Sequence, residues 1–190
     1  MNGYISYLKI LLIAFFVSII VGCNAAWTYL ENKQVVTHQD AFKVSVPGGW
    51  VQYTFGNSQG VFVTKDGPQL QWVSAKRFTH QVAATNTDFE LSKDILPSDL
   101  ARFYEAKFKV ENSTFSIENA QDTLKHIDGA DGFEMYLDYK NERGLRYRSV
   151  VVGFVDDKYF YEITYQAPIL YQFDLHLPVF HSFVDSFARI

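Results

Sequence analysis

Two arginines and two carboxylates fall close together in the second half of the chain, on segments where apolar and polar residues alternate. Arg146 and Arg148 lie on one segment, and Glu134 and Asp138 flank Tyr136 on the segment before it. A third carboxylate of the same charged face, Glu162, is expected on the segment that follows. A guanidinium group offers planar paired donors that suit carboxylates and other anions. This charged surface of Glu134, Tyr136, Asp138, Arg146 and Arg148 is therefore the candidate surface for a ligand or a protein partner.

The same pattern also has a purely structural interpretation. If a three-residue loop joins the two segments, Asp138 faces Arg148 and Lys140 faces Arg146, whereas a four-residue loop changes the register and the faces. Opposite charges across a sheet form ion pairs worth about 0.2–1 kcal/mol each on a solvated face. We favour this ion-pair interpretation over a dedicated anion site.

Histidines provide weaker candidates for metal binding. His176 and His181 are five residues apart, with Asp174 and Asp185 nearby. Two ligands on one face of a helix need a spacing of three or four, and we expect Pro178 to break any helix between the two histidines. A closed zinc site also needs four ligands. We therefore predict no metal site and no cofactor.

A further histidine and the remaining sequence motifs give no support to catalysis. His126 precedes Asp128 and Asp131 in a glycine-containing bend, and aspartate and glycine are what a turn into a strand requires. The chain has no Gly-x-Ser-x-Gly motif and no glycine-rich phosphate loop. We predict that the protein is not an enzyme.

Tyrosines are frequent near the charged surface, at positions 136, 147, 159, 161 and 165. A tyrosine combines apolar area with a hydroxyl group, which suits a ligand pocket or a protein interface. Alternate tyrosines can equally form the core beneath the helices, and we prefer that interpretation.

Hydrophobic periodicity predicts the elements that position these residues. Segments with period two, expected to form a three-stranded antiparallel meander, lie at residues 133–139, 145–155 and 159–165. Shorter strand-like segments lie at residues 42–46, 50–55, 60–64 and 70–75. Helices with an apolar stripe are expected from Pro97 onwards and over residues 178–188.

The composition is acidic and aromatic. Lys and Arg number 17 against 21 Asp and Glu, which gives a formal net charge of −4. Nucleic-acid binding needs a concentrated basic face, so this class of partner is excluded. The 17 Phe and 12 Tyr residues indicate a folded domain with a core of large rings.

The chain has one cysteine, Cys23, which follows Gly22 at the end of an apolar run from Ile10 to Val21. This run has the length of a signal-peptide core and is shorter than the about 20 residues of a membrane-spanning helix. The segment Ile20–Cys23 resembles the lipobox of bacterial lipoproteins. The resemblance implies a signal peptide at residues 1–22 and acyl chains, palmitate among them, on Cys23.

This resemblance also implies export and anchoring to a membrane of the cell envelope. Asn24 follows the cysteine where Asp would favour the inner membrane, so the periplasmic face of the outer membrane is expected in a Gram-negative host. Residues 23–40 are expected to be the lipidated Cys and a tether, and residues 41–190 a single globular domain. Two alternatives stay open: an uncleaved anchor helix, and an ordinary secretory signal in which Gly22-Cys23 is coincidental.

Three further segments carry a second resemblance. Pro47-Gly48-Gly49-Trp50, the strand-like segment Tyr159–Pro168 and the final Phe183–Phe187 are similar to the Mog1/PsbP-like group. The resemblance covers Phe42 to Phe187 and implies an α+β fold, with a twisted antiparallel β-sheet packed between helices. It also implies a module that works by binding other proteins, without catalytic residues.

Together, these observations predict a membrane-anchored, non-catalytic lipoprotein that acts as an accessory or protein-binding module of the bacterial cell envelope, with an envelope protein as partner. The alternative is a lipoprotein that binds a small ligand in a pocket lined by tyrosines, Arg146 and Arg148. An envelope enzyme is a third hypothesis. A deep cavity would favour the ligand, and an exposed apolar patch would favour the partner.

Overall fold

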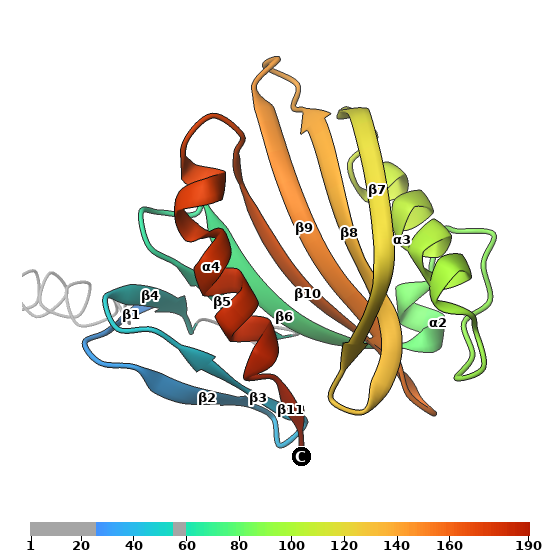
Figure 1. Ribbon diagram of the computed structural model, residues 1–190, viewed down its shortest axis with the longest axis horizontal. Coiled ribbons are helices and arrows are strands. Elements are labelled where there is room, and N and C mark those ends of the chain that lie inside the picture. Colours follow the sequence, from blue (N-terminus) through green and yellow to red (C-terminus); the bar gives the residue numbers. More distant parts are fainter. Residues whose placement is uncertain (1–25, 55–59) are drawn as a thin grey trace, which may run out of the picture.

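The computed structural model describes residues 26–54 and 60–190, which form two antiparallel sheets and three helices (Figure 1). The large sheet contains, in spatial order, β1 (Trp27–Leu30), β4 (Trp50–Tyr53), β5 (Gly60–Thr64), β6 (Trp72–Thr79), β10 (Tyr159–Pro168), β9 (Arg146–Val155), β8 (Ala130–Lys140) and β7 (Ser116–Ile127). The small sheet contains β11 (Ala188–Arg189), β3 (Phe42–Val46) and β2 (Gln34–His38). The helices are α2 (His80–Ala83), α3 (Pro97–Glu111) and α4 (Gln172–Asp185).

Different elements cover the two faces of the large sheet. Helix α4 packs on β10 and on β3 of the small sheet, and α3 packs on β7, β8 and β9 from the opposite side (Figure 1). We call these the α4 face, which includes Val150 and Ile163, and the α3 face, which includes Val151 and Phe160. Because side chains alternate along a strand, each face has a core of its own.

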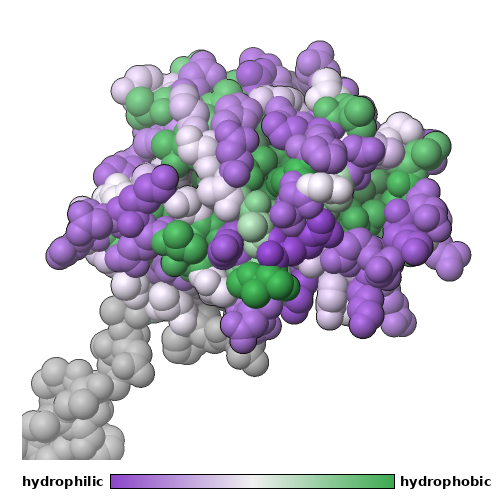
Figure 2. Space-filling view, turned by 60° about the horizontal axis from the view of Figure 1, so that its bottom comes forward, coloured by the Kyte–Doolittle hydropathy of each residue, from purple (hydrophilic) through white to green (hydrophobic). Residues whose placement is uncertain are grey.

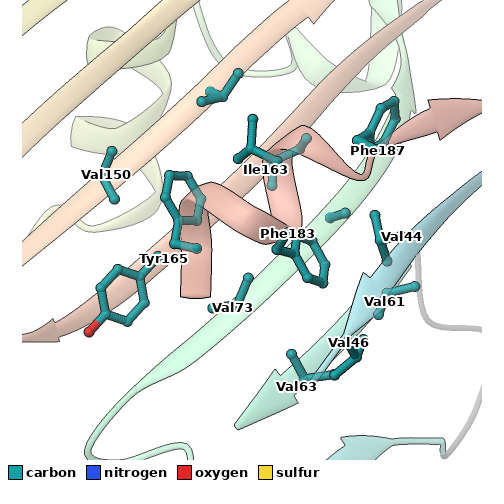
Figure 3. Close-up of a cluster of buried hydrophobic side chains, with 14 of the residues drawn as sticks. Val44, Val46, Val61, Val63, Val73, Val150, Ile163, Tyr165, Phe183 and Phe187 are labelled. Carbon is teal, nitrogen blue, oxygen red and sulfur yellow. The ribbon is translucent and has the colours of Figure 1, made fainter. Parts of the chain in front are cut away.

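The core of the α4 face is built from β-branched residues of the sheet and aromatic residues of the C-terminal segment. Figure 3 shows valines of both sheets converging on Phe183 of α4 and on Phe187, which follows the helix. The ring of Phe187 stacks on Phe42 of β3 at 5.2 Å between centroids. Full burial of such a side chain contributes about 1.5–3 kcal/mol, so this cluster fixes the small sheet and α4 to the large sheet.

The loop between β8 and β9 sets the register of the charged surface. The Asn141 N–H donates to the Leu145 carbonyl at 3.0 Å, and the Gly144 N–H donates to the Asn141 carbonyl at 2.9 Å. Gly144 has φ 74°, a left-handed conformation that glycine adopts without strain. This is the three-residue hairpin loop, and the register expected for it, with Asp138 opposite Arg148, is confirmed.

Strand β7 is not predicted from the sequence. Its twelve residues are mostly polar, and only Ile127 is buried, because β7 is an edge strand of the large sheet. Asp128 and Gly129 connect it to β8 with φ angles of 49° and 76°. Positive φ at both residues is the geometry of the two-residue type I′ turn. The bend expected at this point is therefore the turn of a long hairpin.

The expected tether of residues 23–40 is wrong over much of its length. Strand β1 pairs with β4, strand β2 pairs with β3, and Leu30 is buried in the core of the α4 face. The folded part of the chain therefore includes Trp27 and does not begin at residue 41. Short edge strands of mixed polarity show little hydrophobic periodicity, so the sequence of this segment alone is typical of a linker.

The C-terminal helix also differs from expectation. It begins at Gln172 and ends at Asp185, so it runs through Pro178, and the expected break there is wrong. Proline removes one backbone hydrogen bond within a helix. Four buried side chains of α4, Phe173, Phe180, Phe183 and Val184, hold the helix on the sheet on both sides of this position. Residues 188–189 form β11 instead of continuing the helix.

A tight turn joins β9 to β10, and Asp156 organises it. Its carboxylate accepts hydrogen bonds from the backbone of Lys158 and Tyr159 at 2.9 and 2.8 Å, and from the Tyr161 hydroxyl at 3.0 Å. Burial raises the pKa of Asp156, but the two backbone donors and the Tyr161 hydroxyl lower it more, so the pKa lies below its usual value.

We expect Asp156→Asn to lower the free energy of unfolding at pH 7 by about 1–2 kcal/mol, because charge-assisted hydrogen bonds become neutral ones. A depressed pKa in the folded state means that this contribution is present above the unfolded pKa, near 4, and is lost as the pH falls through the folded pKa. Urea unfolding of both proteins between pH 7 and pH 3 measures it. A stability difference that stays constant across this range contradicts the assignment.

Candidate functional site

The five residues of the predicted charged surface lie on neighbouring strands. Glu134, Tyr136 and Asp138 come from β8, Arg146 and Arg148 come from β9, and all of them point to the α4 face by the alternation of these strands. The structure therefore brings the predicted residues together. What they do there follows from their partners.

Arg148 is fully engaged by Asp138. Its Nε and Nη2 atoms donate to the two carboxylate oxygens at 2.5 and 2.8 Å, and its guanidinium lies 5.5 Å from the centre of the Phe173 ring. The hydrogen bond to Asp138 raises the pKa of Arg148 above its usual value. A guanidinium whose paired donors already hold a carboxylate offers little to a second anion.

The remaining charges of this surface are paired in the same way. Glu118 of β7 accepts from Lys140 at 2.6 Å and from Arg146 at 2.8 Å, and these cations lower the pKa of Glu118. Glu134 lies 3.2 Å from Lys125. These contacts support the cross-strand ion-pair interpretation of the predicted site.

Most of the candidate tyrosines belong to the core. Tyr165 is buried, and its hydroxyl donates to the carbonyls of Gln172 and Phe173 at 2.7 and 2.9 Å. Tyr161 is buried against Phe154, and burial raises its pKa to about 12. Tyr136 packs near Phe173. The core interpretation fits these three.

The histidines are spread over separate contacts. His176 Nε2 lies 3.1 Å from an Asp66 oxygen and its ring meets Trp50 edge-on, whereas His181 packs beside Phe180 on the same helix. His126 lies 2.9 Å from Asp131 in the β7–β8 hairpin. In the part of the chain that the structure describes, no three His, Cys, Asp or Glu side chains converge as metal ligands.

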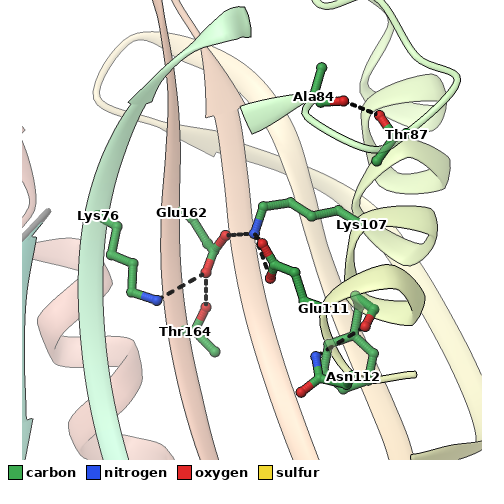
Figure 4. A network of polar contacts seen from close by, with 9 residues as sticks. Lys76, Ala84, Thr87, Lys107, Glu111, Asn112, Glu162 and Thr164 are labelled. Carbon is green, nitrogen blue, oxygen red and sulfur yellow. Dashed lines mark hydrogen bonds and ion pairs between the residues drawn. The ribbon is translucent and has the colours of Figure 1, made fainter. Parts of the chain in front are cut away.

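A buried charge cluster lies under α3 (Figure 4), and it contains Glu162, which was expected on the charged surface but points to the α3 face. Lys107 Nζ lies 3.0 Å from Glu162 of β10 and 2.9 Å from Glu111, and the side chains of Lys107 and Glu162 are only 7% and 5% exposed. Lys76 of β6 approaches Glu162 from the other side at 4.0 Å. The cluster joins helix to sheet, and its charges are mutually compensated.

A second feature is a hollow where four loops meet at one end of the large sheet. These loops connect β5 with β6, α3 with β7, β8 with β9, and β10 with α4. The hollow has a volume of about 710 Å³. We call it the loop-end hollow; its lining includes Leu70, Phe115, Leu145, Arg146, Tyr147, Ile169 and Leu170. Of the predicted surface, only Arg146 takes part.

Specific contacts hold these loops in place. The Ile169 N–H donates to the Arg146 carbonyl at 3.2 Å, and the Thr114 hydroxyl donates to Glu142 at 2.9 Å. Beneath the loops, the Tyr139 ring stacks between the rings of Phe115 and Tyr147, with distances between ring centroids of 5.2 Å and 5.9 Å. The hollow therefore sits on a rigid aromatic layer.

Large apolar side chains around the loop-end hollow are exposed. Leu70, Leu145 and Leu170 are 44%, 54% and 94% exposed, and each comes from a different loop. Tyr171, next to Leu170, is exposed as well. Single exposed leucines are ordinary, but several grouped around one hollow indicate a contact surface. Figure 2 shows, for another face, a mostly hydrophilic surface with separate apolar patches.

Sequence reasoning missed this site because its residues lie in four loops far apart along the chain. Two signals were present. The turn residues of the β8–β9 loop place Leu145 beside Arg146, and the segment Ile169-Leu170-Tyr171 after Pro168 is apolar in a position where a connecting loop is usually polar.

Comparison with known proteins establishes the class of fold. No protein-family model matches the chain, and no curated protein matches it in sequence. Among solved structures, LpqN of Mycobacterium tuberculosis, involved in cell envelope biogenesis, aligns with a TM-score of 0.54 at 12% identity, over 83% of this chain and 90% of LpqN. The chain has a Mog1/PsbP-like fold, as expected from the sequence, with a large antiparallel sheet between helices.

Three further similar structures have TM-scores of 0.49. Cyanobacterial PsbP from Synechocystis sp. PCC 6803 has a TM-score of 0.49 at 14% identity, over 89% of this chain and 98% of that protein. The Ran-binding protein Mog1p of Saccharomyces cerevisiae has a TM-score of 0.49 at 10% identity, over 83% of this chain and 95% of Mog1p. A Bacteroides thetaiotaomicron protein has a TM-score of 0.49 at 12% identity over 85% of this chain, which spans only 49% of that longer protein.

The predicted anchor falls outside the structural description. Residues 1–22 and Cys23 are not among the described residues. Within the part that is described, none of the helices is both long and apolar enough to cross a membrane.

Proposed function

We propose that this chain is a lipid-anchored, non-catalytic accessory protein of the bacterial cell envelope, and that it binds an envelope protein through the loop-end hollow. The observation that carries the proposal is the group of exposed leucines around a hollow held on a rigid sheet. Partner-binding surfaces place apolar anchors at their centre and charged groups at their rim. Glu142, Arg143 and Arg146 supply such a rim.

Anchoring through Cys23 rests on sequence. The lipobox-like segment Ile20–Cys23 after an apolar run supports cleavage before Cys23 and acylation of its thiol. The similarity to LpqN, a protein of cell envelope biogenesis, agrees with an envelope location. Asn24 favours the outer membrane over the inner one in a Gram-negative host.

A second candidate function is the binding of a small ligand in the same hollow. Its volume of about 710 Å³ lies within the range of about 300–1,000 Å³ typical of ligand sites. Tyr147 and Arg146 would then supply the aromatic wall and the charge. The strong exposure of Leu170 favours the protein partner, since a ligand pocket usually encloses its apolar side chains.

Photo-crosslinking in intact cells tests the proposal. A photoreactive amino acid at Leu170 or Leu145 is expected to give one adduct of defined mass, whereas the same group at Leu124, which is 70% exposed on edge strand β7, gives none. Leu170→Asp is expected to abolish the adduct formed from position 145, because a charge at the centre of an apolar contact is costly. Equal labelling at all three positions, or none at 145 and 170, contradicts the proposed surface.

A further inference from the structure

One part of the α3 face carries aromatic side chains that none of the described helices covers. Strands β1, β4, β5 and β6 place Trp50, Val61, Val63 and Val73 in the core of the α4 face. Because side chains alternate, the intervening residues point the other way. They form what we call the aromatic patch: Trp27, Tyr29, Tyr53, Phe62 and Trp72. Helix α3 packs on β7, β8 and β9, at the other end of the sheet (Figure 1).

Four rings of the aromatic patch are in contact with one another. Trp27 meets Tyr53 at 4.9 Å and Phe62 at 6.1 Å between centroids, and Phe62 stacks on Trp72 at 5.4 Å. Tyr29 is 62% exposed, and the other four rings are partly exposed. A hollow of about 340 Å³ lies over Trp27, Tyr53 and Phe62. The patch is therefore a continuous aromatic strip open to its surroundings.

The position of Cys23 places this strip next to the membrane. This step rests on the proposed lipidation. Trp27 is the fourth residue after Cys23, and four extended residues span at most about 14 Å. Acyl chains on Cys23 enter the hydrocarbon region, so the start of β1 is held at the level of the lipid headgroups.

From these observations we propose that the aromatic patch lies against the lipid bilayer and orients the domain on it. Trp and Tyr rings are favoured at the membrane–water interface, where the ring is shielded from water and the polar atom stays hydrated. An exposed cation lies beside the strip and suits lipid phosphates. It is Lys65, which donates to the carbonyl of Gly49, in the turn that precedes β4.

The three tryptophans allow a test on the unaltered chain. Trp27 and Trp72 belong to the aromatic patch, and Trp50 is buried on the other side of the sheet. The protein labelled with fluorotryptophan is placed in nanodiscs of phosphatidylcholine and phosphatidylglycerol, with or without a nitroxide-labelled lipid. The ¹⁹F signals of Trp27 and Trp72, assigned with Trp27→Phe and Trp72→Phe, are expected to disappear with the nitroxide, and the Trp50 signal to persist.

The outcomes separate this proposal from the lipid anchor on which it rests. Intact mass shows whether Cys23 is acylated. If Cys23 is acylated and all three tryptophan signals keep their intensity with the nitroxide, the lipid anchor stands but the proposed orientation is wrong. The orientation is also wrong if the protein's own acyl chain fills the hollow over Trp27, Tyr53 and Phe62. If Cys23 carries no lipid, the proposed anchor is wrong. If the Trp27 and Trp72 signals of this unlipidated protein also stay undiminished with the same nanodiscs, the proposed contact between the aromatic patch and the bilayer is wrong as well.

Discussion

Cys23→Ser is expected to move the protein from the membrane fraction to the soluble fraction and to leave its domain folded. Membrane affinity from acyl chains grows by about 0.8 kcal/mol per buried CH₂, and two chains suffice for stable anchoring. Serine cannot form the thioether, so the whole of this affinity is lost. The domain itself contains no other cysteine and does not depend on residue 23 for any described contact.

Fractionation after a carbonate wash, intact mass and a thermal melt measure this result together. Asn24→Asp is the matched control, because it keeps the acylated thiol and alters only the residue expected to influence the choice of membrane. If the Cys23→Ser protein stays in the pellet, the apolar run of residues 10–21 acts as an anchor helix and the lipobox interpretation is wrong.

Lys107→Met is expected to lower the free energy of unfolding by about 3–5 kcal/mol, the usual cost of leaving a buried charge without its partner. Glu162 would keep only Lys76 at 4.0 Å and the Thr164 hydroxyl at 3.3 Å (Figure 4). The double variant Lys107→Met/Glu162→Met removes both buried charges and is expected to regain most of the loss, since a buried ion pair is often no more stabilising than apolar residues.

The matched control is on the same helix. Lys109 pairs with Glu105 at 2.6 Å but is 59% exposed, so Lys109→Met is expected to change stability by less than about 0.5 kcal/mol. Chemical unfolding of wild type, Lys107→Met, Glu162→Met and the double variant gives the coupling between residues 107 and 162 directly. Additive losses in the double variant contradict the paired cluster.

The pH dependence of the Lys107 contribution provides a further measure of the same cluster. Burial lowers the pKa of Lys107, but Glu162 and Glu111 raise it more, so the pKa lies above its usual value. A raised pKa in the folded state means that the stabilisation is complete below the unfolded pKa, near 10.4, and is lost as the pH rises through the folded pKa. The difference between wild type and Lys107→Met is therefore expected to stay constant from pH 6 to about pH 10.

The parts of the fold that were predictable are those where a residue pattern has one structural solution. The strands of the meander, β8, β9 and β10, are long and rich in apolar residues because both faces of the sheet are covered there, and their turns contain the residues that hairpins require. The start of α3 at Pro97 follows from proline at the first helical turn. Edge strands β1 and β7 were missed because only one side chain of each is buried, so few apolar residues mark a buried face.

The predicted site shows a different limit. The sequence left two registers open, and the three-residue loop of the structure selects the one in which Asp138 lies opposite Arg148. The loop-end hollow and the aromatic patch each depend on which distant loops or strands become neighbours. Trp27, Tyr53 and Phe62 lie far apart in the sequence, and only the order β1-β4-β5 brings their rings together. Nothing in the local pattern around any of them indicates that contact.

Native mass spectrometry of the protein gently extracted from its own host tests the central claim most directly, because it weighs covalent lipid, retained ligand and bound protein in one measurement. Our account predicts an acylated chain in complex with a second protein, and the loss of that protein but not of the lipid in Leu170→Asp. Acylated protein that retains only a small molecule would make ligand binding the function of the hollow. A chain without lipid and without a partner would contradict the account.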